Sequence, residues 1–352
     1  MKEPASLLSD GTRITTCDPL GSTAGILVSL RCLAARKPHM NGTIRGWVPG
    51  HGGDVYWVEH EDKTVAAYGW WEFELNNRRE EMGNTIKKVH LLIIDPQHDF
   101  CAPDGALPVQ GAWDDMNIRL PAMIRRLGSK LDDIHVTLDC HHLVDVAHPV
   151  MWKDTKGNNP SPFTIITANE IESGRWSPVM PSLTRRMLAY TKSLETLGKY
   201  PLCIWPPHCL IGSPGNAVVP ELFAALREWE QKNFAMVDFV SKGSNIYTEH
   251  YSAVKAEVPD PDDTSTHVNT RLIQTLMEAD VLVIAGEAGS HCLRNTTLDI
   301  ASEFGNDAYV AKMVLLTDAT SPVGGFEHFQ DAFVKEMVSR GMQLSTTKDF
   351  LA

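Results

Sequence analysis

Residues 281–304 read VLVIAGEAGSHCLRNTTLDIASEF. The apolar run 281–285 predicts a buried strand, and the amphipathic stretch 292–304 predicts a helix that follows it closely. A short aliphatic strand that leads into a helix is typical of a parallel sheet with helices on both faces. This stretch therefore favours the α/β class.

The same alternation extends over most of the chain. Further strands are expected at 89–95, 134–139, 202–205, 235–240 and 309–316. Further helices are expected at 114–127, 181–197, 220–232, 270–278 and 326–340. We therefore expect residues 86–352 to form a three-layer α/β/α domain with a mostly parallel, doubly wound sheet.

Residues 1–85 have a different character. Four of the nine tryptophans in the chain lie between residues 47 and 77, and the runs 54–59 and 64–68 flank a polar turn. This pattern predicts a small β-rich N-terminal module, preceded by a loosely ordered arm over residues 1–46.

Composition narrows the class of function. Lys and Arg number 32 and Asp and Glu 44, so the formal net charge is −12, which argues against binding to nucleic acid or to an anionic membrane. The sequence contains no apolar run of the ~20 residues that a membrane-spanning helix needs. Seven cysteines at irregular spacings do not suggest a disulfide framework. We therefore expect a cytoplasmic protein.

Ligands of open α/β sheets bind at the carboxyl ends of the strands, so the residues that follow each expected strand are candidates. Asp95 follows the first of these strands and is either a helix cap or a functional carboxylate. Asp139 and His141 follow the second, with His148 nearby, and a third histidine would complete a zinc- or iron-type site. Asp-x-His alone is also common in solvated loops.

Three more expected strand ends carry reactive side chains. Two prolines after Trp205 would fix the direction of His208. Lys242 could pair with carboxylates at the mouth of the sheet. Cys292 begins a helix, where free amides and the helix dipole favour a thiolate and could bind an oxyanion. The alternatives are that Trp205 is a packed core residue, His208 an ordinary loop residue, Lys242 a solvated surface residue and Cys292 a buried structural cysteine.

With these residues together, the sequence resembles the isochorismatase-like cysteine hydrolases, and within them the nicotinamidases. The resemblance covers about residues 88–345. The family motif D-x-Q-x-D-F is matched by Asp95, Gln97, Asp99 and Phe100, and a lysine after the fourth strand is matched by Lys242. The motif G-x-A-x-x-x-C is matched by Gly286, Ala288 and Cys292. The motifs D-x-H and W-P-x-H-C of the metal-dependent members are matched by Asp139, His141, Trp205, Pro206, His208 and Cys209.

The resemblance implies a role for each matched position. It implies a catalytic set of Cys292, Asp95 and Lys242, oxyanion donors at the amides of Ala288 and Cys292, and a cis peptide before Ala288. It implies a divalent transition metal, zinc with iron or manganese as alternatives, held by Asp139, His141, His208 and His148. Phe100 and Trp205 would enclose the ring of a small-molecule amide such as nicotinamide, which would be hydrolysed to the acid and ammonia through a thioester. We also expect a homo-oligomer.

Other functions stay open on the sequence. Another cysteine hydrolase of this superfamily would act on a ureido or N-carbamoyl amide, although such members generally lack D-x-H and W-P-x-H. A non-catalytic binding protein should have lost at least one of the three catalytic side chains, and a vinyl-ether hydrolase typically lacks the cysteine. The chain also departs from the family in residues 1–85 and in a long interval between His141 and Trp205. The aromatic residues of this interval, Trp152 and Trp176 among them, predict that it forms either a lid over the mouth of the sheet or an oligomer interface.

Overall fold

The computed structural model describes the backbone of five strands between residues 27 and 75 and all of residues 87–352. The chain divides into two compact units, Met1–Ile86 and Lys87–Ala352, and each is described by itself. Within the described residues, no helix has both the length and the apolar character needed to cross a membrane.

The first unit contains an antiparallel sheet with the strand order β4-β3-β2-β1-β5. Its strands are β1 (Leu27–Leu30), β2 (Asn41–Val48), β3 (Val55–His60), β4 (Val65–Gly69) and β5 (Phe73–Leu75). The two strands expected from the sequence are β3 and β4. The arm expected over residues 1–46 is wrong in part, because β1 and most of β2 fall within it. β1 is short and is stabilised as a strand by pairing with β2 and with the distant β5. The local sequence pattern does not reveal this pairing.

The second unit is built on a six-stranded, wholly parallel sheet with the order β12-β7-β6-β13-β14-β15. The strands are β6 (Val89–Ile94), β7 (Asp133–Asp139), β12 (Asp238–Lys242), β13 (Val281–Gly286), β14 (Met313–Leu316) and β15 (Gln343–Ser345). From β6 the chain builds outward through β7 and β12, then returns to β13 and builds in the other direction. The point where this order reverses, between β6 and β13, is where doubly wound sheets bind ligands.

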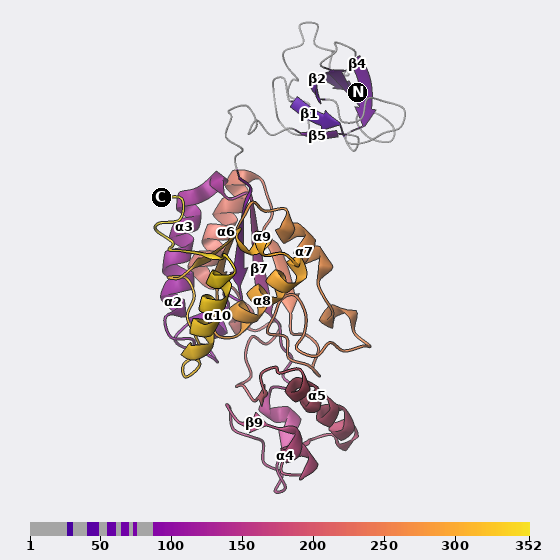
Figure 1. Ribbon diagram of the computed structural model, residues 1–352, viewed down its shortest axis with the longest axis vertical. Coiled ribbons are helices and arrows are strands. Elements are labelled where there is room, and N and C mark those ends of the chain that lie inside the picture. The colour runs from indigo at the N-terminus through magenta and orange to yellow at the C-terminus, as the bar shows by residue number, and fades with distance from the viewer. Residues whose placement is uncertain (1–26, 31–40, 49–54, 61–64, 70–72, 76–86) are drawn as a thin grey trace. The chain divides into compact units, whose positions relative to one another are not determined.

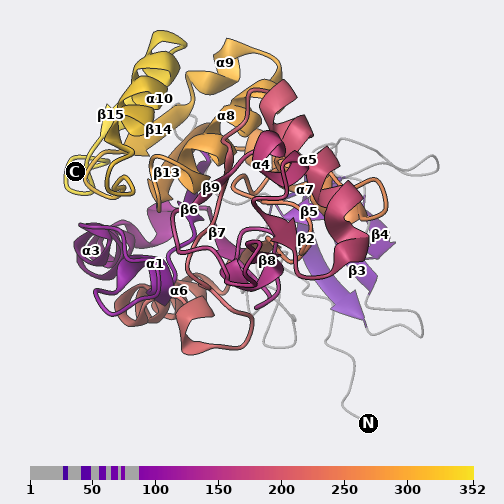
Figure 2. The same ribbon diagram turned by 90° about the horizontal axis from the view of Figure 1, so that it is seen from below.

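Helices cover both faces of this sheet. On one face lie α3 (Leu120–Leu127) and α6 (Pro220–Asn233), and on the other lie α8 (Cys292–Phe304) and α10 (Glu327–Ser339), with α7 (Thr270–Met277) packed beside α8 (Figures 1 and 2). Every residue of β6 is buried, as its aliphatic sequence requires for a strand between two helical layers. The expected three-layer α/β/α architecture is therefore confirmed.

Shorter elements complete the unit. They are α1 (His98–Cys101), α2 (Ala112–Asp114), a π-helix (Asp115–Arg119), α9 (Asp307–Val310), β8 (Trp152–Lys153), β9 (Ile165–Ile166), α4 (Ala168–Glu172), β10 (Ser177–Pro178), α5 (Thr184–Thr196) and β11 (Leu202–Cys203). Between β7 and β12, α4 and α5 form a lobe separate from the helices that flank the sheet (Figure 1).

Three expectations for this unit are wrong. The strand expected at 202–205 does not join the main sheet, because β11 has only two residues and pairs antiparallel with β9. The strand expected at 309–316 begins only at Met313, since α9 occupies the first part of that range. Trp152 belongs to the core and does not line a lid: its side chain is fully buried and its indole N–H donates to the carbonyl of Val146 at 2.7 Å.

A glycine at the end of β13 is required by both space and backbone angle. Gly286 has φ of 123°, and a Cβ there would lie 2.2 Å from the carbonyl oxygen of Ile94. We expect Gly286→Ala to lower the free energy of unfolding by about 3 kcal/mol or more, since displaced backbone adds to the conformational cost. Gly305→Ala is the matched control, because its φ of 64° is also positive but nothing lies within 4 Å of the added Cβ. Urea denaturation of both variants measures the difference, and equal losses would contradict the steric argument.

Candidate active site

A buried lysine links the carboxyl ends of three strands. Lys242 ends β12 and is register-paired with Asp139 at the end of β7. Its Nζ lies 2.9 Å from Oδ2 of Asp95 and 3.0 Å from Oδ1 of Asp139. It also donates to Sγ of Cys292 at 3.6 Å. All four side chains are buried, so one ammonium joins two carboxylates and a thiol away from bulk water.

The backbone near this lysine is shaped for close packing. Gly243 follows Lys242 with φ of 85°, and a Cβ there would lie 2.6 Å from Oδ1 of Asp139. Asp95 also has a positive φ, 45°, which aspartate tolerates better than most residues. Its Oδ1 accepts a hydrogen bond from the hydroxyl of Thr137 on β7 at 2.5 Å. The two strands thus fix the carboxylate of Asp95 in place.

Cys292 is the first residue of α8, as the sequence predicted. The peptide between Glu287 and Ala288 is cis, which the family resemblance implied. Burial raises the pKa of the Cys292 thiol well above its usual value, and Asp95 adds to this rise while Lys242 opposes it. Desolvation therefore outweighs the favourable position at the helix start. A neutral thiol at this place needs a base.

Asp95 has the properties of that base. Burial raises the pKa of its carboxyl group, Asp139 adds to the rise, and Lys242 opposes it. Burial lowers the pKa of Lys242, but Asp139 and Asp95 outweigh this and hold it well above its usual value. Lys242 therefore remains charged, and Asp95 is a carboxylate with a stronger affinity for a proton than an exposed aspartate has.

A second cluster lies beside the first. Ligand atoms of Asp139, His141 and His208 all lie within 4.8 Å of one another. Oδ2 of Asp139 is 3.0 Å from Nε2 of His141 and 3.7 Å from Nε2 of His208. The ring of His148 lies 5.2 Å from that of His141 and 5.5 Å from that of His208, measured between centroids. The structure thus brings together all four residues that the sequence marked as metal ligands.

The outer contacts of the three imidazoles suit a metal site. Nδ1 of His141 contacts Oδ2 of Asp145 at 3.1 Å, and Nδ1 of His208 contacts the carbonyl of Pro206 at 2.8 Å. Nδ1 of His148 contacts the carbonyl of His142 at 3.1 Å, while its buried Nε2 has no hydrogen-bond partner among the described residues. Each ring is therefore held at Nδ1, while Nε2 of His141 and of His208 lies toward Oδ2 of Asp139, an arrangement common among metal-binding histidines.

The charges of this cluster also call for a cation. Burial raises the pKa of Asp139, but His141 and Lys242 outweigh it and hold the pKa well below its usual range. Burial lowers the pKa of His141, but Asp139 and Asp145 outweigh it and raise the pKa well above its usual value. Burial lowers the pKa of His148 to about 4, so this ring stays neutral and able to ligate. Either a proton or a metal ion supplies the positive charge between Asp139 and Asp145, and the donor set fits a zinc-type ion.

Both clusters meet at one pocket with about 450 Å³ of space not filled by atoms, part of it open to solvent. Its walls are Phe100, Leu107, Val109, Asp139, His141, Trp205, His208, Glu249, His250, Tyr251, Ala288, His291, Cys292 and Val323. Phe100 and Trp205, the two residues expected to hold a ring, are among them. The expected oxyanion donors Ala288 and Cys292 also face this pocket. Apolar walls with a few convergent polar groups are typical of a small-molecule site.

Sequence reasoning assigned no role to several residues of this site. Gln97 accepts from the backbone N–H of Asp139 at 2.7 Å and donates to its carbonyl at 2.7 Å, and so holds the end of β7. Glu249 and Tyr251 both accept from the indole N–H of Trp205, at 3.3 and 3.1 Å. Burial raises the pKa of Glu249 to about 7. The sequence marked Gln97 as part of the D-x-Q-x-D-F motif without a role, whereas Glu249 lies in an irregular loop that carries no comparable signal.

Comparison with solved structures identifies the fold of the second unit. The structure of the yeast nicotinamidase Pnc1p is 18% identical and covers 73% of this chain and 98% of its own, with a TM-score of 0.50. The same enzyme bound to the inhibitor nicotinaldehyde gives a TM-score of 0.51 at 18% identity, covering 73% and 99% of the two chains. An Acinetobacter nicotinamidase/pyrazinamidase is 18% identical and covers 75% and 98%, with a TM-score of 0.50.

No protein-family model matches the chain, and no curated protein matches it significantly. At this level of identity the likeness concerns the fold. The second unit thus shares its fold with these nicotinamidases, which is the fold that the resemblance implied.

Proposed function

We propose that this protein is a metal-dependent cysteine amidohydrolase that converts nicotinamide, or a related aromatic amide, to the acid and ammonia. One observation carries the proposal: Cys292, held through Lys242 to Asp95, faces the same pocket as Asp139, His141 and His208. A nucleophile with its base and a cation site converge on a cavity with aromatic walls. The three solved structures compared above are of nicotinamidases, one of them bound to nicotinaldehyde.

The reaction follows from the positions of the three catalytic side chains. Sγ of Cys292 attacks the amide carbonyl carbon as its proton passes to Asp95, and the amides of Ala288 and Cys292 stabilise the oxyanion. Asp95 then gives this proton to the leaving nitrogen as the C–N bond breaks, which releases ammonia and leaves a thioester. A water molecule that gives a proton to Asp95 attacks the thioester, and the acid leaves as the thiol regains its proton.

The cation cluster has a separate role in this proposal. Asp139, His141 and His208, with His148 as a further ligand, would hold a zinc-type ion, and iron or manganese are alternatives. When bound, the ion supplies a fixed positive site for a lone pair of the substrate, such as a pyridine nitrogen. Phe100 and Trp205 contact the faces of the ring. The buried Lys242 pairs with both Asp95 and Asp139, so that Asp95 can act as the base while Asp139 acts as a metal ligand.

Ammonia release from a panel of amides tests the proposal. We expect nicotinamide and other aromatic carboxamides to be hydrolysed, and ureido and N-carbamoyl compounds of similar size to be poor substrates. Activity confined to the ureido compounds would assign the chain to a different chemistry on the same fold. Absence of hydrolysis across the panel by metal-loaded protein would contradict the proposed function.

A substitution of the base separates chemistry from binding. Asp95→Asn keeps the shape and an oxygen for the Thr137 hydroxyl but removes the proton acceptor. We expect kcat to fall by about 10²–10⁴-fold with little change in KM or in metal content. Asp104→Asn serves as the control, since Asp104 is a largely exposed acid close to His98. If kcat of Asp95→Asn stayed near that of the control, Asp95 would not be the base.

A further inference from the structure

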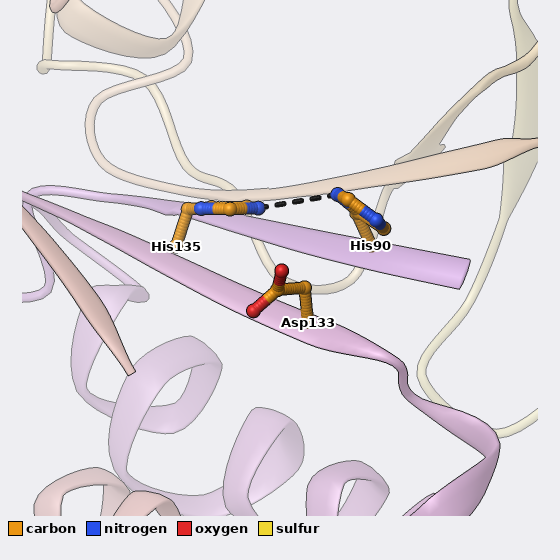
Figure 3. Close-up of side chains that lie close together, drawn as sticks. All are labelled: His90, Asp133 and His135. Carbon is orange, nitrogen blue, oxygen red and sulfur yellow. Dashed lines mark hydrogen bonds between the residues drawn. The ribbon is translucent and has the colours of Figure 1, made fainter. Parts of the chain in front are cut away.

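A second group of metal-type ligands lies at the opposite end of the sheet from the pocket, where β6 and β7 begin. Its members are His90, Asp133 and His135 (Figure 3). In the parallel register His90 pairs with Asp133, and His135 lies two residues further along the same strand as Asp133. Side chains two residues apart on a strand share a face, so all three side chains project from one face of the sheet.

The spacing of these side chains is that of a ligand set. Nε2 of His135 lies 3.2 Å from Nδ1 of His90, and one ligand atom from each residue lies within 4.8 Å of the others. Two ligands at tetrahedral angles on zinc, each about 2.05 Å from the ion, are separated by about 3.3 Å. Figure 3 shows the carboxylate of Asp133 directed toward the space beside the contact between the two histidines.

His135 is oriented by an outer carboxylate. Its Nδ1 lies 3.1 Å from Oδ2 of Asp238 on β12, and Arg271 lies 3.7 Å from the other oxygen of that carboxylate. This contact fixes the N–H of His135 on Nδ1 and leaves a lone pair on Nε2 that faces His90. Without a metal, the N–H at Nδ1 of His90 donates to this lone pair; with a metal, the ion replaces that single proton.

The environment favours a cation with access from solvent. His90 is 4% exposed and His135 1% exposed, whereas Asp133 is only half-buried. Burial lowers the pKa of His90 and His135 adds to the lowering, while the carboxylates of Asp133, Asp132 and Glu278 oppose it and favour a positive charge nearby. Burial thus disfavours a second proton on the His90 ring. A divalent ion satisfies both conditions, because it brings the charge while the imidazoles stay neutral.

We propose that His90, Asp133 and His135 form a second metal site, for a zinc-like divalent transition ion, with water at the remaining positions on the side of Asp133. This site is distinct from the pocket and does not rest on the proposed amidase activity. A bound ion joins the amino ends of β6 and β7, and it stabilises the folded state because the separated ligands of the unfolded chain bind it less tightly.

Zinc titration of a variant that lacks the pocket ligands, His141→Ala/His208→Ala, tests the proposal in the full chain. We expect this variant to bind one equivalent of zinc. Adding His90→Asn should weaken that binding at least tenfold while keeping an N–H donor for His135. Asp238→Asn should weaken it by about 10- to 100-fold, as loss of an outer carboxylate does at other sites. His328→Asn, at an exposed histidine on α10, is the matched control and should bind as its parent does.

A second readout uses the otherwise unaltered protein. We expect wild-type protein equilibrated with zinc to hold two equivalents by elemental analysis, and His90→Asn to hold one. Zinc should also raise the Tm of His141→Ala/His208→Ala, and His90→Asn should abolish that rise. Absence of zinc binding by the pocket-null variant, together with one equivalent in the wild type, would show that the two histidines form only a hydrogen-bonded pair. Unchanged binding after His90→Asn would equally overturn the proposal.

Discussion

Replacing Cys292 with alanine is expected to lower amide hydrolysis by about 10⁴-fold or more, because Cys292 provides the only thiol among the residues that line the pocket. The variant should fold, since the change removes one sulfur atom at the start of α8 and leaves the packing of β13 intact. Ammonia release measures activity, and a thermal melt checks the fold.

Cys203→Ala provides the matched control for this variant. Cys203 is also buried, and burial raises the pKa of its thiol to about 12, but it lies in β11 and does not line the pocket. We expect Cys203→Ala to keep most of the activity. Alkylation should likewise reach Cys292 before the other cysteines, since it alone combines a place in the pocket wall with a neighbouring lysine among the described residues. Hydrolysis that survives Cys292→Ala would refute the mechanism.

Removing two of the pocket ligands, with His141→Ala/His208→Ala, is expected to release one equivalent of metal per chain and to lower kcat/KM for nicotinamide by about 10²-fold or more. Loss of the imidazoles leaves Asp139 and Asp145 without their cation, so residual binding at this site should be weak. Elemental analysis of the purified protein gives the metal content directly.

The control for this variant is His142→Ala, because His142 adjoins His141 in the sequence but its side chain is exposed. We expect it to keep both metal content and activity. Full activity of His141→Ala/His208→Ala in metal-free solution would contradict the role given to the cluster. It would indicate a substrate that binds without a ring nitrogen on the ion.

The sequence predicts those parts of the structure that depend on local pattern. The helix expected at 292–304 is α8 with the same bounds, because an amphipathic stretch after a buried strand is typical of a helix that packs on the sheet. Asp95 directly follows β6 and Asp139 ends β7, as the runs 89–95 and 134–139 predicted. β12, by contrast, ends at Lys242, two residues beyond the expected strand 235–240, and most of its residues are not buried. Since parallel strands place their carboxyl ends at one edge, the meeting of these side chains was predictable as well.

Features that depend on distant pairing were not predictable. Trp205 and His208 reach the pocket from irregular chain after β11, although the sequence favoured a strand of the main sheet there. The contact of Glu249 with Trp205 joins two loops, and no periodicity marks either. The raised pKa of the Cys292 thiol is a similar case, because the degree of desolvation depends on the packed surroundings, which the helix start alone does not specify.

Intact-mass spectrometry of wild-type protein mixed with nicotinamide and quenched in acid tests the central claim most directly, because the claim is that Cys292 carries the acyl group. We predict a covalent adduct of one nicotinoyl group, placed on the peptide that contains Cys292 and absent from Cys292→Ala. Steady ammonia release with an unmodified Cys292 at every quench time, and undiminished turnover by Cys292→Ala, would contradict the account.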